Sequence, residues 1–100
     1  LAIVDGGVKV FAADAPLYTE PYGFDRYGIC VGHPGIRLTR LSEEHGMADL
    51  EPGEDPAIGE ILYFIPNHIC TCVNLMDQVL LKRADGTFAP MDVPGRGKSR

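Results

Sequence analysis

Apolar residues recur along the chain in short runs that are separated by segments containing glycine and proline. Most of these runs have the length of a strand, and turn residues bound them on both sides. The runs cover residues 1–5, 8–12, 28–32, 36–41, 61–65, 73–83 and 88–93. This pattern predicts a mostly β protein, folded as a small β-barrel or a sandwich-like domain.

Two of the runs carry further detail. Residues 36–41 alternate apolar and polar side chains with one slip near the end, which predicts a half-buried strand with a bulge. Ala84-Asp85-Gly86-Thr87 predicts a hairpin turn between the last two strands, because Asp-Gly tolerates the positive φ of tight turns. Residues 13–22 and 51–59 are rich in proline and acidic side chains and are expected to be loops. Helix signals are weak, and the one candidate, residues 41–50, is interrupted by Gly46.

Length and charge restrict the classes of function. One hundred residues, 45% of them hydrophobic, are enough for a single domain spanning 1–100 with a modest core. The net charge of −5 argues against nucleic-acid binding, and no apolar run approaches the roughly 20 residues of a membrane span. Three cysteines, two of them two residues apart, do not form a disulfide framework, so a cytoplasmic, reducing location is expected.

The richest candidate chemistry lies in Pro66-Asn67-His68-Ile69-Cys70-Thr71-Cys72, after an apolar run expected to be a buried strand. If the chain stays extended past Pro66, His68 and Cys70 share a face, roughly 6.5 Å apart along the backbone. An imidazole and a thiolate so placed suit zinc, and two protein ligands leave positions open for water or substrate. Cys72 would lie on the same face, as a third ligand or a bystander. The plain alternative is that these cysteines are small buried hydrophobes, as is expected for Cys30.

Two motifs in this order resemble a known family. Leu41-Ser42-Glu43-Glu44-His45-Gly46, followed by Pro66-Asn67-His68-Ile69-Cys70, is similar to the C-terminal domain of D-serine dehydratase and D-threonine aldolase-like enzymes. These are pyridoxal-phosphate enzymes of the alanine-racemase fold type (fold type III). The opening Asp5-Gly6-Gly7-Val8-Lys9 with Asp14, and the ending Pro94-Gly95-Arg96-Gly97, also resemble that family. The resemblance covers nearly the whole chain.

The resemblance implies that His68 and Cys70 bind zinc beside the cofactor, and that Glu44 and His45 are second-sphere or proton-handling groups. It implies a homodimer, a small D-amino acid substrate, and pyridoxal phosphate held by an N-terminal barrel that is absent from these residues. None of Lys9, Lys82 or Lys98 has a context that matches a Schiff-base lysine, so the domain alone is expected to be inactive. The chain is accordingly expected to be a piece of a longer polypeptide.

Alternatives remain open at this point. Related aldolases carry Asp where this chain has Cys70, and a thiolate favours zinc whereas a carboxylate suits manganese or magnesium. Cys70 therefore favours dehydration of D-serine over retro-aldol cleavage of D-threonine-like substrates. A different class is a non-catalytic, zinc-stabilised interaction module with a closed site, drawn from His68, Cys70, Cys72 and His45.

Overall fold

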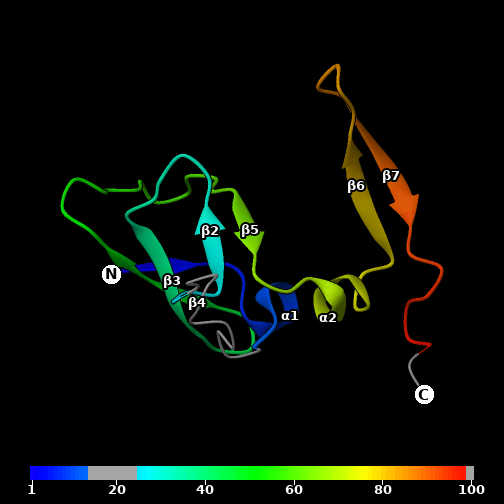
Figure 1. Cartoon of the computed structure of the whole chain (residues 1–100), viewed down its shortest axis with the longest axis horizontal. Helices are drawn as coiled ribbons and strands as arrows, with labels where there is room; N and C mark the ends of the chain where they lie inside the picture. Colours follow the sequence, from blue (N-terminus) through cyan, green and yellow to red (C-terminus); the bar gives the residue numbers. More distant parts are fainter. Residues whose placement is uncertain (14–24, 99–100) are drawn as a thin grey trace.

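The computed structural model describes residues 1–13 and 25–98 as a mostly β protein, as the sequence predicts. Five antiparallel strands form one sheet in the order β1-β4-β3-β2-β5 (Figure 1). They are β1 (Ala2–Val4), β2 (Gly28–Cys30), β3 (Ile36–Leu41), β4 (Gly46–Leu50) and β5 (Phe64–Pro66). Among the described residues β1 and β5 are open edges, so this sheet does not close into a barrel.

The remaining elements lie to one side of the sheet. Two one-turn helices, α1 (Val8–Phe11) and α2 (Cys70–Val73), pack together beside it, and a separate hairpin of β6 (Gln78–Lys82) and β7 (Phe88–Asp92) projects beyond α2 (Figure 1). The turn before β7 contains Gly86 with φ of 86°, which confirms the predicted Asp-Gly hairpin. Nearly all of the predicted loop at 13–22 lies outside the described residues.

A small core lies on the sheet between β2, β3 and β4. Cys30, Ile36 and Ala48 are buried there, and partly buried apolar side chains from β1, β4, β5 and the preceding loop surround them. Cys30 is a core residue, as expected, and burial, together with the charges of Glu54 and Glu60, raises the pKa of its thiol. The predicted bulge in β3 is confirmed, since the register with β4 shifts between Leu38 and Arg40.

Several sequence predictions are wrong in detail. Residues 8–12 form a helical turn, because Phe11 and Ala12 donate backbone hydrogen bonds to Gly7 and Val8. Residues 41–50 are not a helix: the chain reverses at Ser42–His45, where the Ser42 amide donates to the His45 carbonyl at 2.8 Å, and β4 follows. The apolar run at 61–65 gives a strand only from Phe64, and Ile61 is exposed. The run at 73–83 begins as the end of α2, and its strand starts at Gln78.

The loop at 51–59, confirmed as a loop, is tied to the β2–β3 turn by one side chain. The carboxylate of Glu54 accepts a hydrogen bond from the Gly35 amide at 3.2 Å and lies 2.9 Å from Nδ1 of His33. Glu54 is only partly exposed, so water replaces these partners incompletely.

We expect Glu54→Ala to lower the free energy of unfolding by about 1–2 kcal/mol, the usual cost of losing two such hydrogen bonds. Urea unfolding followed by circular dichroism measures it. Glu51→Ala is the matched control, because Glu51 lies in the same loop and is exposed; it should change stability by less than about 0.5 kcal/mol. Equal effects of the two substitutions would show that the Glu54 contacts contribute nothing specific.

Candidate functional site

Helix α1 lies against the first of the two sequence motifs. The Val8 amide donates to the Ser42 carbonyl at 2.9 Å, and Lys9 forms an ion pair with Glu44. A Cβ atom on Gly7 would lie 2.3 Å from the Ser42 carbonyl oxygen, so only glycine permits this approach. The segment that opens the chain therefore holds the turn that carries Glu44 and His45.

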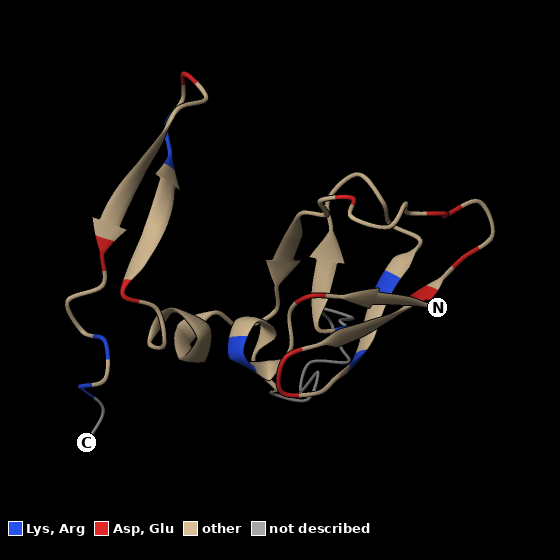
Figure 2. Ribbon diagram, turned by 180° about the vertical axis from the view of Figure 1, so that it is seen from behind, with Lys and Arg blue, Asp and Glu red and all other residues tan. Residues whose placement is uncertain are grey.

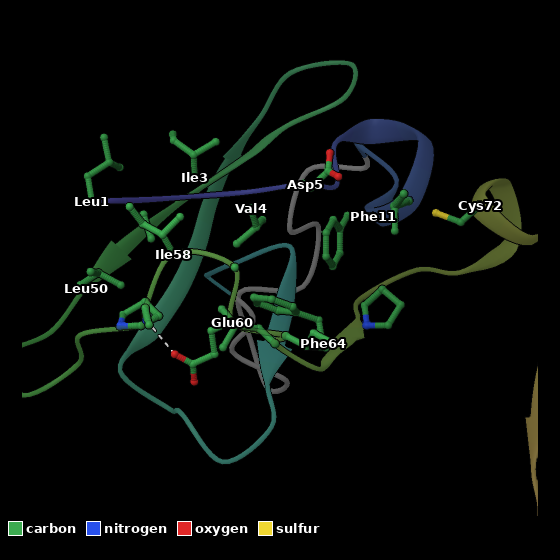
Figure 3. A pocket seen from close by; sticks show the side chains of 18 of the residues that line it. Leu1, Ile3, Val4, Asp5, Phe11, Leu50, Ile58, Glu60, Phe64 and Cys72 are labelled. Atoms are coloured by element: carbon green, nitrogen blue, oxygen red, sulfur yellow. Dashed lines mark hydrogen bonds between the residues drawn. The ribbon is translucent and has the colours of Figure 1, made fainter. Parts of the chain in front are cut away.

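Helix α1 also contacts the second motif. The rings of Phe11 and Phe64 pack edge to face, with centroids 5.3 Å apart and planes at 81°. Phe64 opens β5, the strand that leads into Pro66 and His68. Helix α2 packs against α1, and the sulfur of Cys72 is directed towards Phe11 (Figure 3). Two motifs about twenty residues apart in sequence are thus linked through one helical turn.

The geometry at His68 and Cys70 differs from the sequence expectation. The strand ends at Pro66, and Cys70 is the first residue of α2, so the segment is not extended. Asn67 fixes the change of chain direction after β5. Its backbone amide donates to the Tyr27 carbonyl at 3.1 Å, and its side-chain amide donates to the Arg26 carbonyl.

This turn separates the two cysteines of the motif. Residues two apart on a helix point to different sides, and accordingly Cys70 is exposed whereas Cys72 is buried. His68 is exposed at the entrance to the same helix. The expectation that Cys72 shares the face of His68 and Cys70 is wrong, because that expectation required a strand.

Glu44 and His45 both lie in the β3–β4 turn and are exposed. The Glu44 carboxylate is paired with Lys9, a partner that sequence reasoning did not suggest. The backbone amide of His45 donates a hydrogen bond to the Ser42 hydroxyl at 3.1 Å, and His45 is exposed to solvent. The turn thus presents one carboxylate and one imidazole beside α1.

No three His, Cys, Asp or Glu side chains gather closely enough to hold one metal ion within residues 1–13 and 25–98. The closed four-ligand arrangement of a structural zinc module is therefore not assembled by these residues. An open site with two protein ligands remains compatible with the chain: His68 and Cys70 supply nitrogen and sulfur, which is a donor set that zinc accepts. Both side chains reach solvent, where further ligands could bind.

The fold and the paired motifs define a small β-domain with a candidate open metal site, and comparison with known proteins identifies its family. Residues 1–81 match the family model described as "Putative serine dehydratase domain". The chain belongs to this family. The resemblance drawn from the two motifs is thereby confirmed.

Individual relatives agree with this assignment. An uncharacterized protein of Mycobacterium tuberculosis, and another of Mycobacterium bovis, are each 32% identical over 99 residues, covering 97% of this chain and 70% of the relative. A D-threonine aldolase of an Arthrobacter species is 35% identical over 71 residues, which is 69% of this chain but only 18% of that enzyme. The chain is thus a D-serine dehydratase- or D-threonine aldolase-like domain. No helix among the described residues is long and apolar enough to cross a bilayer.

Proposed function

We propose that this chain is the metal-bearing β-domain of a pyridoxal-phosphate enzyme that dehydrates D-serine to pyruvate and ammonia. The observation that carries the proposal is the contact of α1 with both motifs, Ser42–His45 on one side and the strand leading to His68 and Cys70 on the other. Membership of the serine dehydratase family supports the same class of reaction.

We assign zinc to His68 and Cys70. Zinc bound there would act as a Lewis acid that stabilises negative charge on the hydroxyl oxygen leaving the substrate. The chain's own residues would hold the ion and leave its other positions open, which a catalytic zinc site requires. Glu44 and His45 are proposed to hold or move protons at the edge of this site, and the pairing with Lys9 keeps the Glu44 carboxylate in place.

Pyridoxal phosphate is proposed to be held by an N-terminal barrel domain. This β-domain would contact that barrel, and the complete enzyme would be a homodimer. The cofactor supplies an electron sink for a carbanion at the substrate Cα. The three lysines of this chain have other positions: Lys9 is paired with Glu44, Lys82 ends β6, and Lys98 lies in the C-terminal tail. The β-domain would therefore contribute the metal and not the cofactor lysine.

Retro-aldol cleavage of a D-threonine-like substrate is the second candidate, because one relative is named a D-threonine aldolase. Replacing Cys70 by Asp would distinguish dehydration from retro-aldol cleavage, since a carboxylate favours manganese or magnesium relative to zinc. In the full-length enzyme that carries this domain, we expect Cys70→Asp to lower D-serine dehydration more than D-threonine cleavage, and to make activity respond to added manganese. Assays of both substrates with each metal measure the ratio. An unchanged ratio and metal preference would remove the support for dehydration.

A further inference from the structure

Asn67 holds the end of the sheet at the point where the chain leaves it for α2. The register of β2 with β5 pairs Gly28 with Pro66, so its continuation by one step places Tyr27 opposite Asn67. A hydrogen-bonded pair of this kind normally exchanges two backbone bonds. Here the Asn67 amide donates to the Tyr27 carbonyl at 3.1 Å, whereas the Tyr27 amide donates to the Leu38 carbonyl at 2.8 Å. The backbone pairing of β5 is therefore weaker at this last step than at a regular pair.

The side chain of Asn67 supplies a second bond at this step. Its amide group donates to the carbonyl of Arg26, the residue before Tyr27. One residue of the segment is thus tied to two consecutive carbonyls of the neighbouring chain. Residues 66–76 contain no Lys, Arg, Asp or Glu, as Figure 2 shows for the connection from β5 through α2. The segment is therefore attached to the sheet mainly by neutral hydrogen bonds, two of which Asn67 makes immediately before His68.

The two proposed zinc ligands depend on different parts of the fold. Cys70 opens α2, and this helix is held by its packing against α1 and by the burial of Cys72. His68 lies before the helix and directly after Asn67, the last residue bound to the sheet. Cys70 is therefore placed by the helix, whereas His68 is placed by the end of the sheet. Both attachments have to hold if the two side chains are to bind one ion.

We propose that Asn67 is a positioning residue of the zinc site. Its side-chain bond to the Arg26 carbonyl holds His68 within reach of the ion that Cys70 binds. The inference rests on the proposed function, because it takes His68 and Cys70 as the zinc ligands. Without this bond the turn between β5 and α2 samples more conformations, and the fraction in which both ligands face one ion falls. One hydrogen bond changes such a fraction roughly 2- to 10-fold, and zinc affinity should fall by the same factor.

The experiment measures zinc affinity in the full-length enzyme that carries this domain, by competition with a chromophoric chelator. Asn67→Ala removes the side-chain donor and keeps both ligands, so zinc should bind roughly 2- to 10-fold more weakly than in the native protein. Glu54→Ala is the matched control, because it also removes a side-chain hydrogen bond, to Gly35, but at the other end of β2. It should lower stability and leave zinc affinity unchanged. Thr71→Ala, next to Cys70 and exposed, should also bind zinc with native affinity. Circular dichroism establishes that each variant is folded.

Cobalt in place of zinc separates the position of a ligand from its identity. At saturating cobalt, Asn67→Ala should keep the thiolate charge-transfer absorption of the native protein, because Cys70 remains a ligand, whereas Cys70→Ala should lack it. The inference alone is overturned if Asn67→Ala binds zinc with native affinity while Cys70→Ala loses it, or if Glu54→Ala weakens zinc binding as much as Asn67→Ala. Loss of the absorption in a folded Asn67→Ala variant would equally contradict a positioning role, since the ligand set would then have changed. A native protein that binds no zinc would overturn the proposed function, and this inference with it.

Discussion

Cys70→Ala is expected to abolish most zinc binding, whereas Cys72→Ala is expected to preserve it. Cys70 is exposed at the start of α2, and Cys72 is buried with its sulfur directed towards Phe11 (Figure 3). Loss of a direct thiolate ligand should weaken zinc binding by at least the roughly 10- to 100-fold that loss of an outer-shell partner costs. Cys72→Ala removes only a buried packing group, which should lower stability by about 1 kcal/mol.

Competition with a chromophoric chelator measures zinc affinity in both variants, and cobalt substitution reports the thiolate through its charge-transfer absorption. In the full-length enzyme carrying this domain, activity should fall with zinc affinity in Cys70→Ala and stay near the native value in Cys72→Ala. Retention of native zinc affinity by Cys70→Ala would exclude Cys70 as a ligand. Loss of zinc from a folded Cys72→Ala variant would instead identify the buried thiol as the ligand and require α2 to open.

The strands could be predicted because their signals are local. The alternation in β3 and the Asp-Gly pair before β7 depend on residues close in sequence, and both predictions are confirmed. The two helical turns could not be predicted, since Val8–Phe11 and Cys70–Val73 are rich in residues that favour strands. Their conformation depends on distant contacts, such as Phe11 on Phe64, which override local preference.

The same distinction applies to the candidate site. The motifs containing Glu44 and His68 are visible in sequence and led to the correct family. The ion pair of Glu44 with Lys9 joins residues 35 positions apart, so no local sequence pattern predicts it. Cys70 and Cys72 point to different sides of α2 because this segment is a helix, whereas the sequence predicted an extended strand. A doubled glycine at Gly6-Gly7 was the available signal for a close backbone approach.

The close approach of Gly7 to the Ser42–Glu43 backbone leaves no room for a side chain. Gly7→Ala should therefore lower the free energy of unfolding by about 1–3 kcal/mol or more, the range for overpacking. Its Cβ would lie 2.3 Å from the Ser42 carbonyl oxygen and 2.5 Å from the Glu43 carbonyl. These are backbone atoms, so a rotamer change cannot relieve the overlap, and α1 must move off the turn. The hydrogen bond from the Val8 amide to Ser42 should then break, at a further cost of about 1 kcal/mol.

Gly95→Ala is the matched control, because nothing lies within 4 Å of a Cβ at Gly95; its effect should stay within about 0.5 kcal/mol. Urea unfolding gives both free energies, and amide hydrogen exchange at Val8 tests the local cause, since that amide should exchange faster only in Gly7→Ala. Displacing α1 also removes the link between the Ser42–His45 turn and the strand that leads to His68. Zinc affinity should therefore fall less in Gly7→Ala than in Cys70→Ala, because the ligands remain while their support is lost. Native stability and native Val8 exchange in Gly7→Ala would show that α1 does not hold the two motifs together.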